Sequence, residues 1–381
     1  MTTATARLDA GVRPKTATTP AQAANPDREA IDLVRDLVAA PSLSGHEQSA
    51  VRLFAERMSR LGYRAAIDIA GNAVGVIGST DPDASEIVLL GHIDTVPGRI
   101  PVRVDEDGYL WGRGSVDAKG PLAAFAIAGA RAALPEGVRL VVVGAVGEET
   151  PTSPGARFIR DRHRPVACII GEPSHWDRYT VGYKGRLLVE ATFEQNGGHS
   201  AGPQGAVAER VVRWWNHLRA NIGEWNIGRE GLFDTIQASL QHMETSSDGL
   251  TDRARATVGL RLPTWADPAA VEADLCTVSP GVELRVYGHT PGVRTGRANT
   301  VSRALASAIA DEGGRARAVV KTGTSDMNTV FRAWGCPIAA YGPGDSTLDH
   351  TPEERLDLAE YLRSIRVLSG AIERIAGDSA A

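Results

Sequence analysis

The hydrophobic and polar positions of this chain follow two different periods. Residues 28–40 and 47–62 place apolar side chains three and four positions apart, which predicts two amphipathic helices. Short apolar runs bounded by glycines come next and predict strands, with one alanine-rich helix between the second and third. The expected strands span 72–78, 85–92, 138–148 and 167–172, and the helix spans 121–134. Strands interleaved with helices predict a layered α/β domain.

The pattern changes between Tyr179 and Gly292. A long strand pattern over 178–195 opens this stretch, followed by a helix, two strands, a helix and a last strand. These later elements are expected at 206–220, 235–244, 253–263, 267–278 and 282–290. The order β-α-β-β-α-β is that of a ferredoxin-like α+β unit. Because α/β signals resume at 301–313, 317–323, 337–344 and 353–376, we expect this unit to be inserted into the first domain.

The resulting domain prediction has four segments. Residues 1–27 are expected to form a disordered tail, 28–178 and 293–381 the two parts of the larger domain, and 179–292 the inserted lid or dimerisation domain. The tail is rich in Ala, Thr and Pro and has no apolar core of the kind that a secretory signal requires. Its Arg and Thr content gives it a faint similarity to an organelle transit peptide.

Composition narrows the class of protein. With 381 residues, 43% of them hydrophobic and 23% charged, the chain has the profile of a globular protein with a large core. The net charge of −5 is mild and the Lys and Arg residues are scattered among acids, so no nucleic acid partner is expected. No apolar stretch approaches the ~20 residues that cross a bilayer, so no membrane association is expected. The cysteines Cys168, Cys276 and Cys336 lie far apart, which favours a reducing, cytoplasmic setting.

Candidate chemistry gathers where the predicted strands end. The residues concerned are His92 and Asp94, Glu148 and Glu149, Glu172, Asp349 and His350, with Asp117 in the loop between the first two of these strands. In open α/β sheets, functional groups collect beyond the carboxyl ends of the strands, so neighbouring strands would bring these side chains into one pocket. So many carboxylates would repel unless cations neutralise them, and imidazole with carboxylate oxygen suits a pair of zinc ions. Taken singly, each residue reads as an ordinary loop, turn or helix-cap residue.

The adjacent pair Glu148 and Glu149 raises a question of its own. In an extended chain, neighbouring side chains point to opposite faces, so two adjacent carboxylates cannot easily act at one point. We therefore expect the two side chains to diverge and to have different roles.

Six motifs in order carry a resemblance that covers about residues 28 to 370. They are GHIDTVP, GRGSVDAKGPLAA, GEETPTSPGARF, GEPS, GGHSAGP and LDHTPEE. This series resembles the dinuclear zinc peptidases and deacylases that include glutamate carboxypeptidase, acetylornithine deacetylase and succinyl-diaminopimelate desuccinylase. The resemblance implies that the larger domain is a zinc-peptidase catalytic domain, that the cofactor is two zinc ions with cobalt as a substitute, and that the protein is a homodimer.

The resemblance also implies roles for individual residues. Asp117 would bridge the two zinc ions, with His92 and Glu172 completing one metal site and Glu149 and His350 the other. Asp94 would orient the His92 imidazole, and Glu148 would be the general base. His199, in the inserted domain, would stabilise the oxyanion of the reaction intermediate, either in its own subunit or in a partner. A strand-end loop histidine is the alternative for His199.

The resemblance also implies residues for substrate binding. Arg261 occupies the place of the family's substrate-binding arginine, although a solvated strand arginine is the alternative. Thr324 and Ser325, in the motif KTGTSDMN, are expected to lie in a turn that faces the pocket.

Details within the motifs resemble one subfamily. GRGSVDAKG, GYKGR, KTGTSDMN and YGPGDSTLDHTPEE are similar to hydrolases of lysine and arginine biosynthesis, which release lysine or ornithine from a small acidic amino-group carrier protein. There the amino acid's α-amino group is held as an amide by the side-chain carboxyl of the carrier's C-terminal glutamate. Basic residues at the pocket mouth would suit such a carrier, and the candidates are Lys184 to Arg186, Arg294, Arg297 and Arg303. The alternatives are an N-acyl amino acid deacylase, a carboxypeptidase or dipeptidase, and a binding protein without activity.

Overall fold

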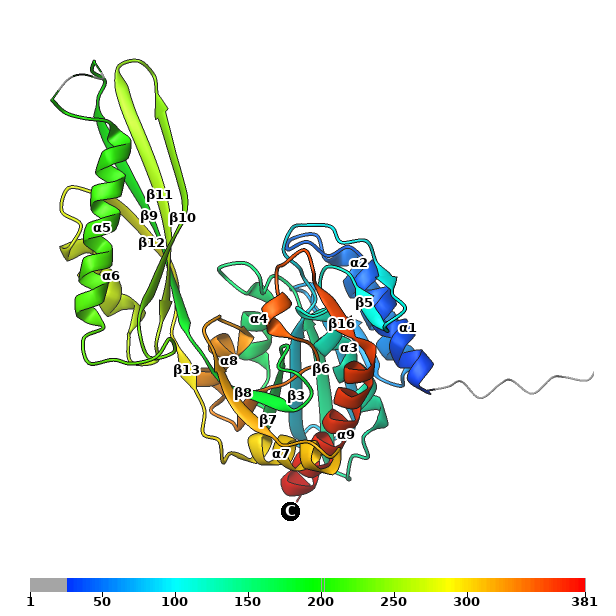
Figure 1. Ribbon diagram of the computed structural model, residues 1–381. Helices are drawn as coiled ribbons and strands as arrows, with labels where there is room; N and C mark the ends of the chain where they lie inside the picture. Colours follow the sequence, from blue (N-terminus) through cyan, green and yellow to red (C-terminus); the bar gives the residue numbers. More distant parts are fainter. Residues whose placement is uncertain (1–25, 200, 202, 381) are drawn as a thin grey trace, which may run out of the picture.

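Two bodies joined side by side make up the described part of the chain, which comprises residues 26–199, 201 and 203–380 of the computed structural model (Figure 1). The larger body is built on a twisted sheet, called here the large sheet. Its strands lie in the order β1 (Arg64–Ile67), β2 (Ala73–Gly78), β6 (Val138–Ala145), β3 (Ser85–His92), β7 (Ala167–Gly171), β15 (Ile338–Ala340), β8 (Arg178–Tyr183) and β13 (Val293–Arg294), with β14 (Arg317–Lys321) also beside β8. Strands β6, β3, β7 and β15 are mutually parallel neighbours in its centre.

Helices cover both faces of the large sheet. One face carries α1 (Pro26–Ala39), α2 (Gln48–Arg60), α3 (Lys119–Arg131), α7 (Thr300–Asp311) and α9 (Leu358–Ala380), and the other carries α4 (Pro154–Arg162) and α8 (Asp326–Trp334). A separate small group of strands, β4 (Arg103–Val104), β5 (Tyr109–Trp111) and β16 (Arg355–Asp357), lies at one edge of this body. The chain therefore has the predicted layered α/β domain.

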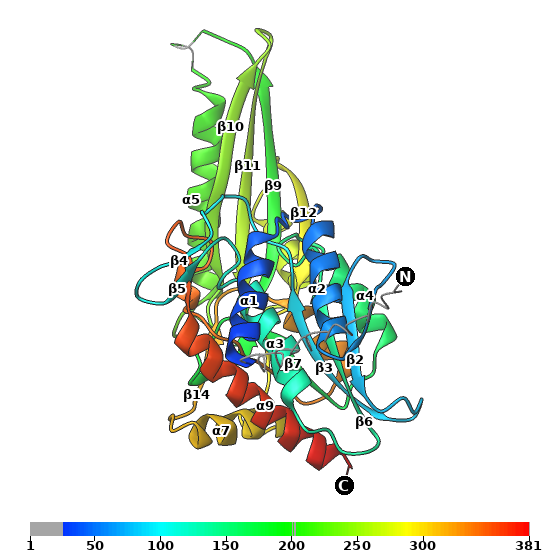
Figure 2. The ribbon, with the colours of Figure 1, turned by 90° about the vertical axis from the view of Figure 1, so that its right-hand side faces the viewer.

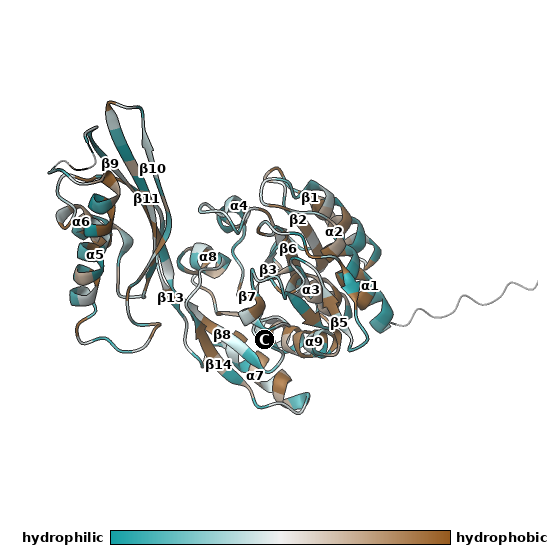
Figure 3. Cartoon of the chain, turned by 45° about the horizontal axis from the view of Figure 1, so that its top comes forward, coloured by the Kyte–Doolittle hydropathy of each residue, from teal (hydrophilic) through white to brown (hydrophobic). Residues whose placement is uncertain are grey.

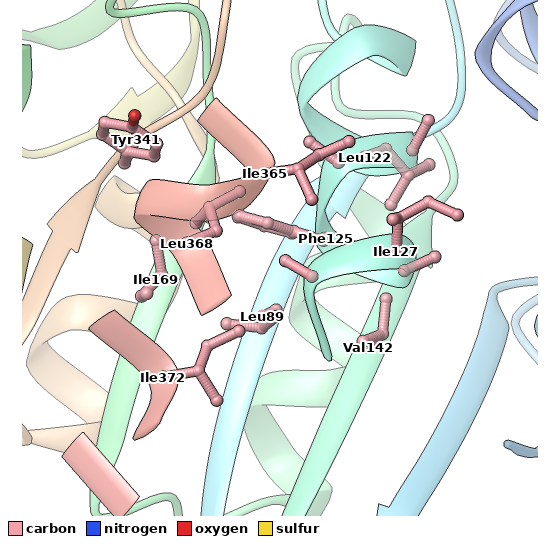
Figure 4. Packing of buried hydrophobic residues seen from close by; sticks show 14 of the residues in the cluster. Leu89, Leu122, Phe125, Ile127, Val142, Ile169, Tyr341, Ile365, Leu368 and Ile372 are labelled. Atoms are coloured by element: carbon pink, nitrogen blue, oxygen red, sulfur yellow. The ribbon is translucent and has the colours of Figure 1, made fainter. Parts of the chain in front are cut away.

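Side chains that point from the large sheet toward its covering helices fill the core between these layers. Leu89 of β3 and Ile169 of β7 pack beneath Phe125 of α3 and Leu368 of α9, and all four are fully buried (Figure 4). Burying one such side chain contributes about 1.5–3 kcal/mol to folding. This packing fixes the central strands, and with them the groups that follow their carboxyl ends.

The second body is a long, narrow sheet backed by helices, called here the small sheet (Figure 2). Its strands lie in the order β10 (Gln237–Ser247), β11 (Thr251–Leu262), β9 (Gly185–Asn196) and β12 (Glu283–Thr290), and α5 (Val207–Trp225) and α6 (Pro268–Thr277) pack on one face. The hydropathy colouring shows the apolar side of α5 turned toward the strands (Figure 3). The element order is the predicted β-α-β-β-α-β, so the inserted ferredoxin-like unit is confirmed.

The single long strand expected over 178–195 is wrong. The segment forms two strands, β8 in the large sheet and β9 in the small sheet, and they are separated at Lys184. A β-carbon placed on Gly185 would lie 2.2 Å from the carbonyl oxygen of Thr290, where the chain returns from the small sheet. Only glycine permits this close approach of the two connecting segments. The chain therefore enters the small sheet at Gly185, several residues after Tyr179.

Other boundaries also differ from the sequence-based expectation. Helix α1 begins at Pro26, so the last two residues of the expected tail are helical, and residues 1–25 lie outside the described residues. The closing helix begins at Leu358, because residues 355–357 form β16. The elements β1, β4, β5, β13, α4 and α8 were not expected, being short or lacking a strong period. Within the described ranges, no helix combines the length and the apolar character needed to span a bilayer.

Glu86, near the start of the central strand β3, is held by two basic side chains and gives a first prediction. Its carboxylate accepts hydrogen bonds from Arg139 Nε at 3.1 Å and His163 Nδ1 at 2.8 Å. Burial raises the pKa of Glu86, but the bonds to His163 and Arg139 outweigh burial and lower it. Because the folded pKa lies below the unfolded one, this stabilisation is present above the unfolded pKa and is lost as the pH falls.

We therefore expect Glu86→Gln to reduce the free energy of unfolding by about 1–2 kcal/mol at neutral pH. The difference from the wild type should shrink as the pH is lowered through the acidic range. Urea unfolding of both proteins at a series of pH values measures this, and a difference that does not depend on pH would contradict the assignment.

Candidate functional site

The carboxyl ends of the parallel strands meet at one cavity of about 570 Å³. Residues that follow β6, β7 and β15 reach it, together with the loop before α3, the start of β9, the end of β11 and the loop after β14. The residues predicted from sequence that line it are Asp117, Glu148, Glu149, Glu172, Arg186, Arg261, Thr324, Asp349 and His350. The structure thus brings together side chains that are up to 233 positions apart (350 minus 117).

Asp117 lies between the two histidines. Its Oδ1 is 3.2 Å from His92 Nε2 and its Oδ2 is 3.1 Å from His350 Nε2. The same His350 nitrogen is 3.0 Å from Glu149 Oε1. Donor atoms of Asp117, Glu149 and His350 all lie within 4.8 Å of one another, a spacing that suits a metal ion. One carboxylate thus presents one oxygen to each of two nitrogen donors.

The shifted pKa values in this cluster reflect an excess of carboxylates over cationic groups. Burial raises the pKa of Glu172 to about 8, with a further contribution from Asp117, and burial raises the pKa of Asp349 to about 9. Burial also raises the pKa of Glu148 well above its usual range. The hydrogen bond to Asp117, with that to Glu149, raises the pKa of His350 to about 10. The site therefore favours the binding of added positive charge.

Asp94 holds the main chain that carries the glutamate pair. Its carboxylate accepts from the main-chain N–H of Glu148 at 3.0 Å and of Glu149 at 3.1 Å, and from Ser44 Oγ at 2.7 Å. His92 Nδ1 lies 3.1 Å from the Asp94 carbonyl oxygen and 3.6 Å from its carboxylate. Asp94 therefore contacts the imidazole as expected, mainly through its main chain, and its carboxylate also positions the glutamates.

The divergence of Glu148 and Glu149 has a different origin from the one expected. Strand β6 ends at Ala145, so the pair lies in a turn and not in an extended strand. The turn, anchored by Asp94, directs Glu149 to His350, while Glu148 lines the cavity. The two carboxylates therefore occupy distinct positions in the site.

Only some of the residues expected to bind substrate line the cavity. Arg261 Nη1 donates to Thr324 Oγ1 at 3.1 Å, and both line the cavity. The Ser325 hydroxyl instead accepts from Met327 N at 3.2 Å and caps α8, so its expected contact with substrate stays a prediction.

His199 lies far from this cavity within its own chain. It is exposed, three residues beyond the end of β9, and its Nδ1 accepts from the main-chain N–H of Ala201 at 3.1 Å. Arg186, at the start of β9, lines the cavity. An extended strand rises about 3.3 Å per residue, so the ten steps from Arg186 to Asn196 cover about 33 Å. In this arrangement the His199 imidazole cannot reach the cavity of its own subunit.

The basic residues expected at the cavity mouth also differ among themselves. Lys184 is fully buried and its Nζ donates to the Leu232 carbonyl at 2.7 Å and to Gln237 Oε1 at 3.0 Å, so its placement at the mouth is wrong. Arg186 lies inside the cavity. The remaining candidates, Arg294, Arg297 and Arg303, are exposed and are not among the residues that line it.

Sequence reasoning missed Glu354 and Tyr183, and it gave no role to the side chain of Asp326. Glu354 is fully buried and accepts from Asp117 N at 3.2 Å and from Arg113 Nη1 at 2.6 Å, so it fixes the loop of Asp117. Asp326 lies near the cluster, and burial raises its pKa to about 7. Tyr183 lines the cavity, as does Arg186, which was expected at the cavity mouth. Glu354 stands four residues after His350 in LDHTPEE, which is a signal that could have been followed; the other positions depend on strand pairing.

Comparisons with known proteins find relatives that match most of the chain. Residues 88–374 match the family described as Peptidase family M20/M25/M40. A LysW-lysine hydrolase of Deinococcus radiodurans is 48% identical over 361 residues, which cover 92% of this chain and 99% of the relative. Among solved structures, an M20-family metallo-carboxypeptidase from Sulfolobus solfataricus superposes with a TM-score of 0.74 at 16% identity, covering 91% of this chain and 99% of that one. A dinuclear metal-binding M20 peptidase from Bacillus subtilis gives 0.66 at 14% identity, covering 92% and 99%.

Proposed function

This chain belongs to peptidase family M20/M25/M40, and from that premise we propose that it is a metal-dependent amide hydrolase that releases lysine, ornithine or a related diamino acid from the C-terminal glutamate of an amino-group carrier protein. The observation that carries this proposal is the 48% identity to a LysW-lysine hydrolase over nearly the full length of both chains. A similarity of that extent includes both the large and the small sheet. The carrier is expected to be a small acidic protein.

The proposed cofactor is two zinc ions, and the donor set fits them. Asp117 would bridge the two ions, His92 and Glu172 would complete one site, and Glu149 and His350 the other. Support comes from the contacts of the two Asp117 oxygens with the two histidines. The raised pKa of the buried Glu172 carboxyl points the same way, because a cation beside it would restore its charged form. When bound, two such ions polarise a carbonyl and raise the acidity of water.

Side chains of the protein would carry out proton transfer, position the glutamate pair and bind the substrate. Glu148, which lines the cavity and makes no ion pair among the described residues, is proposed to take a proton from the attacking water and to pass it to the leaving amine. Asp94 would keep Glu148 and Glu149 in register through their main-chain N–H groups. Arg261 and Thr324 are proposed to hold a carboxylate of the substrate, and Ser325 would support them through the start of α8.

The test compares two substrates of the purified, zinc-loaded protein. One is a carrier protein with lysine or ornithine on its terminal glutamate, and the other is N-acetylornithine. Mass spectrometry of the released amino acid gives kcat/KM for each. We expect faster release from the carrier, whereas faster turnover of N-acetylornithine would overturn the proposal in favour of a deacylase.

We further propose a homodimer in which His199 serves the partner's active site. Strand β10 is an edge of the small sheet, and its residues from Ser239 to Ser247 are exposed. An edge strand of this length presents unpaired main-chain groups that favour pairing with a second copy. A partner joined at this edge would supply its His199 to a cavity that the His199 of the same subunit cannot reach.

We also propose a reducing, cytoplasmic compartment for the protein. The free cysteines Cys168, Cys276 and Cys336 support it.

A mixing experiment tests the position of His199. His199→Ala and Glu148→Gln are each expected to be inactive as homodimers. If His199 acts across the dimer, a 1:1 mixture refolded or co-expressed should regain about a quarter of wild-type activity, because half of the dimers then hold one complete site. An inactive mixture, with mixed dimers demonstrated by affinity tags, would contradict action in the partner.

A further inference from the structure

Two arginines face each other across neighbouring strands at the cavity. In the register of β9 and β11, Arg186 lies directly opposite Arg261. Both line the cavity that also contains Glu148. Directly opposite residues of an antiparallel pair have β-carbons about 4.5–5.5 Å apart, so the two guanidinium groups share one small region.

On the same face of the small sheet, two other arginines of β11 pair with acids. Further along β11, Arg253 Nε lies 2.8 Å from Glu194 Oε1, and Arg255 lies 3.6 Å from carboxylate oxygens of Glu190 and Glu244. The pair at the cavity departs from this pattern, because within the described ranges neither Arg186 nor Arg261 lies within 4.0 Å of a carboxylate oxygen.

Neutral groups are the partners of the cavity pair. Arg186 Nη2 donates to the carbonyl of Thr150 at 3.2 Å, and Arg261 Nη1 donates to the Thr324 hydroxyl at 3.1 Å. Arg186 Nε is buried and has no hydrogen-bond partner among the described residues. These contacts orient the two groups but do not neutralise their charge.

Two facing guanidinium groups reduce the stability of the fold unless an anion binds to them. Like charges directly opposite on paired strands are destabilising, and the burial of both guanidinium groups adds to the cost. Glu148 attracts both groups and Glu149 attracts Arg186, but neither glutamate forms an ion pair with them within the described ranges. Burial lowers the pKa of Arg261, and the neighbouring Arg186 lowers it further. A planar guanidinium matches a carboxylate through two parallel hydrogen bonds, so a ligand with carboxylates would relieve both guanidinium groups.

We propose that Arg186 is a second carboxylate-binding residue, so that Arg186 and Arg261 each bind one of two carboxylates that flank the scissile amide. This inference rests on the proposed function. An amide between the α-amino group of a diamino acid and the side chain of a C-terminal glutamate leaves one free α-carboxylate on each side. An N-acetyl amino acid has only one, so the pair would favour the glutamyl substrate.

Binding measurements without turnover test this assignment. The background is zinc-loaded Glu148→Gln protein, and the ligands are Nα-(γ-glutamyl)-lysine and two analogues in which one or the other α-carboxylate is a neutral amide. By titration calorimetry, Arg186→Ala should weaken binding of the full ligand roughly 10- to 100-fold, yet barely affect the analogue that lacks its carboxylate. Arg261→Ala should show the same selectivity toward the other analogue.

Matched variants separate this role from a structural one. Arg255→Ala, on the same strand and face but paired with glutamates, should leave all three affinities unchanged. Arg186→Lys should keep part of the affinity, because it keeps the charge but loses the planar fork. Thermal unfolding of each variant checks that the fold is intact.

Several outcomes would overturn the inference. They are no binding of the full ligand, an Arg186→Ala effect that is absent or equal for all three ligands, and dependence of both arginines on the same carboxylate. The proposed function fails separately, if the wild-type enzyme does not release the amino acid from the carrier. The two results are distinguishable because the binding assay uses neither the carrier nor turnover.

Discussion

Replacing Glu148 by Gln should lower kcat by at least about a thousandfold while two metal ions per chain are retained. The amide side chain keeps the size of the carboxylate but cannot accept a proton from the attacking water. Its main-chain N–H still donates to Asp94, so the turn that carries Glu149 should stay in place. Steady-state kinetics on the carrier-bound substrate, with metal content by mass spectrometry of the same sample, measures both halves of this prediction.

The control for this experiment is Glu353→Gln, an exposed glutamate that follows His350 by three residues and is absent from the cavity lining. It should have wild-type activity. A Glu148→Gln enzyme with more than a few per cent of wild-type kcat would remove the general-base assignment. A variant that loses its metal as well would instead place Glu148 among the ligands.

The second large effect is expected from Asp117→Asn. Asn is nearly isosteric, but it is neutral and offers only one oxygen where Asp117 presents one oxygen toward each histidine. Both proposed metal sites share this side chain, so the metal content should fall from about two ions to fewer than one, with activity reduced at least about a thousandfold. Because a ligand that binds only the folded state raises the unfolding temperature, added zinc should stabilise metal-free wild type but not the variant.

Asp311→Asn is a suitable control, because Asp311 is an exposed carboxylate on α7 that pairs with Arg374 outside the cavity. Its response to zinc should equal that of the wild type. If Asp117→Asn still binds two zinc ions, the bridging role is wrong, and each site would have to be completed by other carboxylates such as Asp349.

Local sequence determined a large part of the fold. The helical period of residues 28–40 and the continuous apolar runs that became β3, β6 and β7 depend on neighbouring positions alone, so they could be predicted. The same runs also placed His92, the two glutamates and Glu172 at strand ends. The gathering of these residues in one cavity followed because parallel strands end at the same edge of a sheet.

Tertiary structure decided where locally similar segments belong. Residues 178–195 carry one continuous strand pattern, yet β8 pairs with β14 and β9 pairs with β11, because sheet partners are set by contacts far away in sequence. The burial of Lys184 at this boundary has the same cause, since its acceptors are the Leu232 carbonyl before β10 and Gln237 at the start of β10. A charged residue in a strand pattern reads as exposed until its partners are known.

The candidates for the metal site could be predicted from the sequence, whereas the arginine pair could not. Sequence alone determined the residue types of the candidate metal site, because each stands directly after a strand or within a motif of fixed spacing. Only the tertiary structure set Arg186 opposite Arg261, 75 positions away (261 minus 186), since cross-strand register depends on how the strands of the inserted unit pair. It likewise separated His199 from its own cavity, because the direction and length of β9 fix where that histidine lies.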